Sequence, residues 1–298
     1  MRKEFPKYTL DAFSYGTTVK RLYGTPTQIE NIGLVVNTSL VKVPKTFAQF
    51  EKEALAFKRK GSDNLAVAVP QGSGGDPYHM MPFFSGLCGY VFGKTKGQLD
   101  PHKLGIANSK FLKNSKLIDK WNREGLINSK VDYSTAMNAF LSKKAAFWIT
   151  GPWNSDTLKQ SGLSYRLIQV PKIKCRSVPF LGVQGFMVTK FANTHGVATL
   201  AKDLVGNYMM GVNSQRDLAA ANGRFPANKT AGRRLTDRLL AQFGRAGTGG
   251  VPLPNIPQMN SVWSEWGGAW VKATKGAGAT PARAAFVTAA RNIRDKIG

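Results

Sequence analysis

The segment "AAFWITGPWNSD" (residues 145–156) joins an apolar, strand-like run to a polar stretch through Gly151 and Pro152. Proline is favoured at the first position of a helix, so the sequence predicts a strand that ends at this pair and a helix that follows it. Trp153 is then placed at the carboxyl end of the strand, where open α/β sheets build their ligand sites. The alternative is a tryptophan that fills a core, and the local sequence leaves both interpretations open.

Short apolar runs alternate with helical patterns along the rest of the chain. Strand-like runs occupy residues 32–37, 65–69, 145–150, 165–170 and 185–189. Helices are predicted at 109–124, 133–143, 194–211, 213–222 and 233–243, with two more beyond residue 253. Further helix starts are indicated by Thr46 with Gln49 as a capping box, by Asp76 before Pro77 and by Thr280 before Pro281. The alternation predicts a layered α/β fold.

The charge of the chain is strongly positive, at +25 from 42 Lys and Arg against 17 Asp and Glu. Such a balance favours polyanions such as nucleic acid or anionic lipid. The basic residues are spread over the polar faces of the predicted helices, however, and no basic stripe is interleaved with stacking aromatic residues. We therefore favour a solvated basic surface, with a polyanion site as the alternative.

The cysteines, the histidines and the amino terminus carry little signal. Cys88 lies in the apolar segment "FFSGLCGYVF" (83–92), which is typical of a buried helix, and Cys175 is distant. We expect two buried thiols, with a disulfide left open. No metal site or cofactor is predicted, because the histidines lack the spacing of metal ligands: His79, His102 and His195. The start "MRKEFPKYTL" lacks the apolar stretch of a signal peptide, so taken literally the sequence predicts a cytoplasmic chain.

Catalytic motifs such as a nucleophile elbow, a phosphate-binding loop or a zinc-protease helix do not occur in the sequence. The aromatic residues are more informative. Trp263, Trp266 and Trp270 are spaced to share one side of a helix. We expect Trp266 and Trp270 to lie in the core, whereas Trp263, near the helix start, is placed to reach a cleft.

Two carboxylates and a tyrosine are further candidates. Asp76 and Tyr78 lie at a helix entrance, where the carboxylate serves as a cap or as a ligand group and the tyrosine is expected to be exposed. Glu30 stands between a turn and a fully apolar strand, and a carboxylate in that position needs a partner. Taken alone, Glu30 is interpreted as half of a structural ion pair.

Several segments together resemble one family, the extracellular solute-binding proteins of carbohydrate ABC importers, of the maltose/maltodextrin-binding kind. The resemblance covers nearly the whole chain and rests on these segments, in order: "LYGTPTQIENIGLVVNTSLV", "DPYHMMPFFSGLCGY", "VDYSTAMNAFLSKKAAFWITGPWNSD", "VPFLGVQGFMV", "NGRFPAN" and "VPLPNIPQMNSVW". It implies a two-lobed periplasmic-binding-protein-like α/β fold (type II) with sugar held between the lobes. By position, Glu30 faces the cleft, Asp76 and Tyr78 touch the sugar, and Trp153 and Trp263 stack on glucose rings.

The resemblance also implies the organisation of the chain. The carboxyl-terminal lobe is expected to comprise 31–180 and 238–298, and the remainder of the amino-terminal lobe 1–29 and 186–234. Crossovers are expected near 30, 181–185 and 235–237. Because family members carry an export signal and further chain ahead of this starting point, we expect an incomplete amino-terminal lobe, weaker sugar binding and exposed apolar surface prone to aggregation.

The function implied by the resemblance is binding, without catalysis, of a maltose/maltodextrin or trehalose-type oligosaccharide. Its partners are the membrane subunits of an ABC permease, with no nucleic acid expected. The full-length form is expected to be a monomer located outside the cell, membrane-anchored as a lipoprotein or periplasmic. Two alternatives are carried forward: a basic polyanion-binding protein, and a glycosidase that uses Glu30 and Asp76 as its carboxylate pair.

Overall fold

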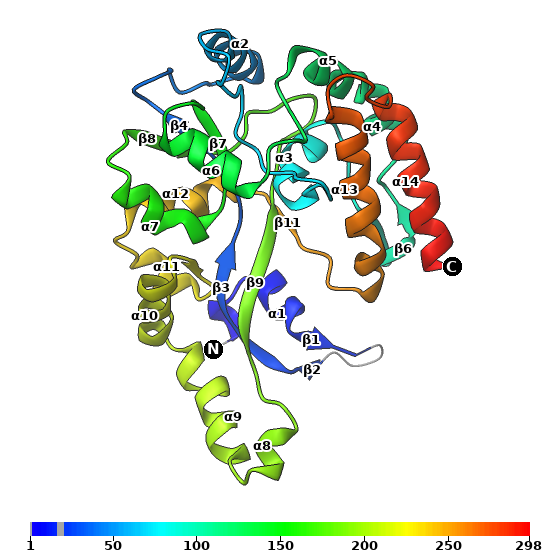
Figure 1. Cartoon of the computed structure of the whole chain (residues 1–298). Coiled ribbons are helices and arrows are strands. Elements are labelled where there is room, and N and C mark those ends of the chain that lie inside the picture. The colour runs from blue at the N-terminus through cyan, green and yellow to red at the C-terminus, as the bar shows by residue number, and fades with distance from the viewer. Residues whose placement is uncertain (1, 17–20) are drawn as a thin grey trace.

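Two β-sheets with their surrounding helices form two lobes in the computed structural model, which describes residues 2–16 and 21–298 (Figure 1). We call them the β4 lobe, built on the sheet β7-β4-β8, and the β3 lobe, built on the sheet β10-β3-β9-β11. β3 (Gly24–Glu30) is followed almost directly by β4 (Gly33–Asn37). The chain therefore passes from one sheet to the other immediately after Glu30.

Two of the three strands in the sheet of the β4 lobe are buried along their whole length. These are β4 and β7 (Phe147–Thr150), which pair antiparallel. β8 (Tyr165–Ile168) pairs antiparallel with β4 on its other edge, and its Arg166 is exposed. The strand expected at 65–69 is not formed as such. That segment contributes two isolated parallel bridges, Leu65 to Ala145 and Ala68 to Trp148.

Two helices of the β4 lobe begin at predicted caps, whereas the helix predicted to start at Thr280 begins later, at Ala282, with Pro281 in the capping position. Thr46 accepts a hydrogen bond from the backbone of Gln49, and Asp76 caps the helix that starts at Pro77. The helix expected over 109–124 is two helices, because the Ser115 hydroxyl bonds back to the Leu112 carbonyl between them. The elements of this lobe, apart from its sheet, are α2 (Phe47–Lys58), α3 (Pro77–Gly86), β5 (Phe92–Thr95), β6 (Gln98–Leu104), α4 (Ser109–Asn114), α5 (Lys116–Glu124), α6 (Tyr133–Leu141), η2 (Pro152–Asn154), α7 (Ser155–Gln160), α12 (Arg238–Ala246), η4 (Pro257–Met259), α13 (Asn260–Thr274) and α14 (Ala282–Ile297).

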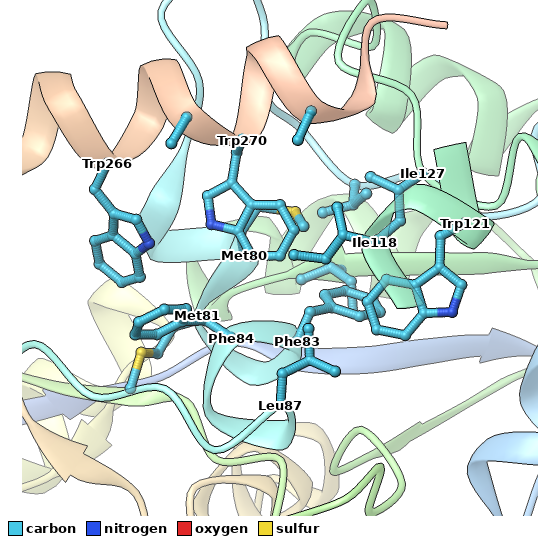
Figure 2. Packing of buried hydrophobic residues seen from close by; sticks show 14 of the residues in the cluster. Met80, Met81, Phe83, Phe84, Leu87, Ile118, Trp121, Ile127, Trp266 and Trp270 are labelled. Carbon is cyan, nitrogen blue, oxygen red and sulfur yellow. The ribbon is translucent and has the colours of Figure 1, made fainter. Parts of the chain in front are cut away.

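The main core lies between α3, α5, α13 and α14. Trp266 and Trp270 project from α13 towards the apolar side chains of α3, as Figure 2 shows. Both tryptophans are fully buried, with Trp266 against Phe84 at 4.8 Å and Trp270 against Phe286 at 5.2 Å between ring centroids. The prediction that these two tryptophans fill the core is confirmed.

A disulfide joins Cys88 to Cys175, so the expectation of two free buried thiols is wrong. The apolar pattern around Cys88 suggested a helix, but α3 ends at Gly86 and Cys88 lies in the turn beyond it, with a φ of 72°. The backbone N–H groups of Lys174 and Cys175 both donate to the Gly86 carbonyl, which brings the second sulfur to the first. Such an approach depends on tertiary contacts that sequence spacing does not reveal.

The sheet of the β3 lobe is built from strands that are distant in sequence. β3 lies between β9 (Phe180–Met187) and β10 (Phe225–Pro226), antiparallel to both, and β11 (Val251–Pro252) pairs parallel with the start of β9. β3 was not among the predicted strands, and β9 starts before the predicted residue 185. The other elements are η1 (Arg2–Glu4), α1 (Lys7–Ala12), β1 (Ser14–Tyr15), β2 (Arg21–Leu22), α8 (Phe191–Thr194), α9 (Ala198–Gly206), η3 (Tyr208–Met210), α10 (Val212–Asn222) and α11 (Lys229–Arg233).

The helices are short or polar relative to a segment that spans a bilayer. Over residues 2–16 and 21–298, none is both long enough and apolar enough to cross a membrane.

Candidate functional site

Four aromatic rings from separate parts of the chain form a continuous run. Trp153 contacts Tyr78 at 6.2 Å between ring centroids, Tyr78 contacts Phe180 at 6.1 Å, and Phe180 contacts Trp263 at 6.1 Å. Phe180 is buried, whereas the other three rings are partly exposed. Three residues predicted from different segments are thus brought together through one buried phenylalanine that the sequence did not single out.

Trp153 is held by the strand-to-helix turn that follows β7. Pro152 opens the short helix η2, as the sequence predicted. Gly151 makes room for the indole, because a Cβ at Gly151 would come within 2.3 Å of two ring atoms of Trp153. The ring therefore lies against bare backbone and stays partly exposed.

Asp76 caps α3, and both of its carboxylate oxygens accept hydrogen bonds from His79. The backbone N–H of His79 donates to Oδ1 at 3.0 Å, and its ring Nδ1 donates to Oδ2 at 2.6 Å. Burial favours the neutral carboxyl, but the hydrogen bonds and charge of His79, aided by the backbone N–H of Tyr78, outweigh it and lower the pKa of Asp76. Asp76 is therefore an ionised acceptor at neutral pH.

Tyr78 is more buried than the sequence predicted. Its hydroxyl is inaccessible and has no hydrogen-bond partner among the described residues. Burial, followed by the charges of Glu30 and Asp76, raises the pKa of Tyr78 well above its ordinary value. The neutral hydroxyl consequently retains both its donor and its acceptor capacity for a ligand group.

Glu30, at the end of β3, forms the ion pair expected of a carboxylate at that position. Its Oε2 accepts from Arg224 Nε at 2.7 Å and from Gln184 Nε2 at 2.9 Å. Arg224 was not predicted as its partner, because only the pairing of β10 with β3 brings the two residues together. Glu30 is paired across the sheet with Gly182, two residues beyond Phe180 on β9, so the ion pair lies next to the aromatic run.

Trp263 occupies the first turn of α13, on the same side as the buried Trp266. The two indoles are stacked, with centroids 6.3 Å apart and planes inclined by 23°. Trp266 is thus the buried support of a partly exposed ring, which agrees with the different roles predicted for these tryptophans.

The chemistry of this set of residues is that of a surface for polyhydroxylated rings. Aromatic faces pack against apolar C–H groups, and ionised carboxylates accept hydrogen bonds from hydroxyls. Among the residues that the structure describes, no group of three or more His, Cys, Asp or Glu side chains is arranged to hold a metal ion.

The family profile described as "Bacterial extracellular solute-binding protein" matches residues 3–237. The chain belongs to this family. Two Bacillus subtilis (strain 168) proteins are similar to it at 28% identity each. The galactooligosaccharide-binding protein matches over 82% of this chain and 59% of its own length, and the maltodextrin-binding protein over 88% and 62%. The chain thus spans about three fifths of these curated relatives.

Solved structures agree with the architecture of this solute-binding protein. A Thermus thermophilus maltotriose-binding protein, bound with maltotriose, superposes with a TM-score of 0.82 at 28% identity, covering 99% of this chain and 77% of that one. A cyclo/maltodextrin-binding protein complexed with maltotetraose gives a TM-score of 0.81 at 24% identity, covering 99% and 74%. The predicted two-lobed, type II periplasmic-binding fold is confirmed.

Proposed function

We propose that this solute-binding protein binds a maltose/maltodextrin or trehalose-type oligosaccharide between its two lobes and delivers it to an ABC permease. The observation that carries the proposal is the run of partly exposed rings Trp153, Tyr78 and Trp263. Asp76 adjoins it through His79, and Glu30 through its pairing with Gly182 on β9. The names of the similar proteins, which refer to maltodextrin, maltotriose and galactooligosaccharide, support the same ligand class.

The physical basis of binding is stacking combined with hydroxyl recognition. A pyranose packs its C–H faces on Trp153 and Trp263, and its hydroxyls donate to the carboxylates. Tyr78 contributes its partly exposed ring to this stacking surface, while its hydroxyl stays buried. Selectivity follows because each polar group left unpaired in the closed site costs about 1–3 kcal/mol.

The lobes of the proposed sugar site follow the chain division expected from the sequence. One lobe comprises 1–29 and 186–234, the other 31–180 and 238–298, with crossovers near 30, 181–185 and 235–237. Separate strand sets, β10-β3-β9 and β7-β4-β8, support this division, whereas β11 (Val251–Pro252) lies in the range of the second lobe and pairs with the start of β9 at the crossover. Ligand is enclosed when the lobes close about the crossovers.

The proposed setting is outside the cell, with the protein membrane-anchored or periplasmic and acting as a monomer beside the permease. The family description supports an extracellular role. The disulfide between Cys88 and Cys175 also supports it, because disulfides persist in oxidising compartments.

Calorimetric titration with maltotriose, maltose and trehalose tests the proposal. We expect heat and saturation with at least one of these sugars, and a large loss of affinity in Trp263→Ala. Tyr208→Ala is the matched control, because Tyr208 is an exposed aromatic residue of the β3 lobe outside the aromatic run. A folded protein that gives no heat with any of the three sugars contradicts the proposal.

The absence of glycosidase activity belongs to the same proposal. A glycosidase needs one carboxyl kept protonated near neutral pH, whereas the pKa of Asp76 is lowered and Glu30 is paired with Arg224. We expect no release of chromophore from a chromogenic glucoside. Turnover that disappears in both Glu30→Gln and Asp76→Asn would establish the enzyme instead.

A further inference from the structure

His79 lies between two groups of the proposed sugar site, the Asp76 carboxylate and the Trp153 indole. Its side chain is 7% exposed, so it is covered by its neighbours rather than presented to a ligand. Its Nδ1 is 2.6 Å from Asp76 Oδ2, and its ring meets the Trp153 ring edge-to-face at 5.7 Å and 80°. One buried side chain therefore contacts both groups.

The two hydrogen bonds from His79 restrict rotation of the Asp76 carboxylate. A capping residue ordinarily accepts backbone hydrogen bonds alone, which leaves its second oxygen free to turn. Here Oδ1 accepts from the backbone of His79 and Oδ2 from its ring, so rotation of the carboxylate breaks one bond or the other. The outward lone pairs of Asp76, which is partly exposed, are consequently fixed in direction.

The surroundings of the imidazole are otherwise aromatic. Its other ring contacts are Tyr78 at 5.9 Å and Tyr133 at 6.4 Å, and its Nε2 is buried without a hydrogen-bond partner among the described residues. The titratable groups around the ring are Asp76 and Tyr78 on its own helix and Tyr133 on α6. Asp76 is the one that anchors it by a hydrogen bond.

We infer that His79 is a positioning residue that holds the Asp76 carboxylate and the Trp153 indole in one fixed arrangement. The inference rests on the proposed function for the identity of the ligand, and on the geometry alone for the positioning. This positioning role differs from a purely structural one. A residue that only supported the helix cap would stabilise α3, but it would not determine how the Asp76 carboxylate and the Trp153 indole are aligned.

Two substitutions separate the contacts of His79. His79→Phe keeps an aromatic ring against Trp153 but removes the donor to Asp76 Oδ2. His79→Asn keeps a donor at the position of Nδ1 but removes the ring edge. His102→Asn is the matched control, because His102 is an exposed histidine on the β5–β6 hairpin.

Two measurements on the unliganded protein report the arrangement. The pKa of Asp76 is followed by carbon-13 NMR of labelled aspartate, with its signal assigned by Asp76→Asn. The Trp153 environment is followed by fluorine NMR of 5-fluorotryptophan-labelled protein, with its signal assigned by Trp153→Phe. We expect His79→Phe to raise the pKa of Asp76 and His79→Asn to restore it, whereas the Trp153 signal moves in His79→Asn.

Affinity for maltotriose supplies the functional measurement. We expect both variants to bind roughly tenfold more weakly than the wild type, His79→Phe because Asp76 loses a hydrogen bond and His79→Asn because Trp153 loses its ring contact. His102→Asn should bind normally. An unchanged Asp76 pKa and Trp153 signal in both variants overturns the inference, even if thermal stability falls. If only one variant folds, the inference is tested by the signal expected to change in it: the Asp76 pKa in His79→Phe or the Trp153 signal in His79→Asn.

Failure of the inference is distinguishable from failure of the proposed function. If the wild type binds no sugar, but the His79 substitutions change the Asp76 and Trp153 signals as described, the positioning role is supported and the proposed function is contradicted. If the wild type binds sugar, but neither the Asp76 nor the Trp153 signal changes in the His79 variants, the proposed function is supported and the positioning role is overturned.

Discussion

Trp153 lies across the backbone of Gly151, and this placement separates it from the tryptophans of the core. An indole supported by backbone on one side is held in place without being enclosed. Trp270, in contrast, is surrounded by side chains of α3 and α14 and is fully buried. Removal of the two rings should therefore have different consequences.

Replacement of Trp153 by Ala should weaken binding of the preferred sugar at least tenfold, about 1.4 kcal/mol, with little change in stability. The reason is that the ring supplies stacking area more than core packing. Replacement of Trp270 by Ala should instead lower the free energy of unfolding by about 3–5 kcal/mol. Calorimetry measures the change in affinity, and urea denaturation measures the change in the free energy of unfolding. Unchanged affinity in Trp153→Ala would show that Trp153 is a packing residue and does not bind the sugar.

The charge of Asp76 should stabilise the protein in a pH-dependent way. Its pKa is lower in the folded state than the ordinary value of about 3.9, so the stabilisation is present above that pH and is lost as the pH falls through the folded-state pKa. Asn caps helices as well as Asp, so Asp76→Asn isolates the charge. Urea denaturation should show a stability deficit at pH 7 that closes in acid.

The exposed Asp156 provides the control for this titration, since Asp156→Asn removes a carboxylate of the same type from the surface. Its stability difference should be small throughout the pH range. A deficit in Asp76→Asn that stays constant from pH 7 to pH 3 would show that the loss comes from packing rather than charge.

At the scale of elements, local signals predicted part of the fold and long-range pairing determined the rest. β4, β7, β8 and the capped starts of α2 and α3 follow from apolar runs and capping residues. β3 contains Pro26 and polar Thr and Gln, so its sequence does not indicate a buried strand. It is a strand because β9 and β10 pair with it, which is information carried by distant segments.

The candidate site shows the same division. Trp153, Tyr78 and Trp263 are brought into one aromatic run, and Asp76 and Glu30 lie on or next to the elements that carry its rings. The side chains that connect or orient them were missed: Phe180, His79 and Arg224. A buried phenylalanine, a histidine without metal-ligand spacing and one arginine among many have no distinguishing local pattern.

The disulfide should be a major source of stability for the elements that it joins. It links the end of α3 to the segment before β9 across a sequence separation of 87 residues. Loop closure of this length corresponds to about 4–5 kcal/mol in the chain-entropy treatment. The double change Cys88→Ser with Cys175→Ser should lower the free energy of unfolding by an amount of that order.

Chemical denaturation with and without dithiothreitol checks this prediction. The wild type should lose stability on reduction, and the double variant, which has no thiols left, should be insensitive to the reductant. Equal stability of the two proteins under oxidising conditions would exclude a stabilising bond.

For the whole molecule, the positive charge is distributed over many helix ends. Basic residues occupy the last turn of helices in both lobes, where they offset the partial negative charge of the carbonyls. Examples are Lys58 of α2, Arg123 of α5, Arg233 of α11, Arg245 of α12, Lys272 of α13 and Arg294 of α14. This arrangement favours a solvated basic surface over a single polyanion-binding patch.

Exposed apolar side chains are concentrated on the β3 lobe. α8 and α9 contain no buried residue, and Leu200 of α9 is 73% exposed. Other large exposed apolar residues lie on neighbouring elements of this lobe: Tyr15, Tyr23, Phe186, Met187, Phe191, Val197, Leu204 and Tyr208. Apolar surface was expected from the sequence, and exposed apolar side chains gathered on neighbouring elements promote association.

Self-association of the 298-residue chain should therefore depend on α9. The double change Leu200→Gln with Leu204→Gln should reduce the oligomeric fraction in size-exclusion chromatography with light scattering, because it removes apolar surface without disturbing a core. Val287→Gln is the control, since Val287 is exposed on α14 in the other lobe. Equal association of the wild type, the double variant and Val287→Gln would show that the associating surface lies outside α9.

The pairing of β3 with β9 also governs when the molecule can fold. Thr27 and Gln184, which are hydrogen-bonded across these strands, are 157 residues apart. At ordinary rates of protein synthesis, β9 follows β3 from the ribosome by roughly 8–30 s. The sheet of the β3 lobe cannot assemble during that interval. Until β9 has been synthesised, the edge of β3 that it later covers stays unpaired, so the nascent chain remains open at the place where this sheet finally forms.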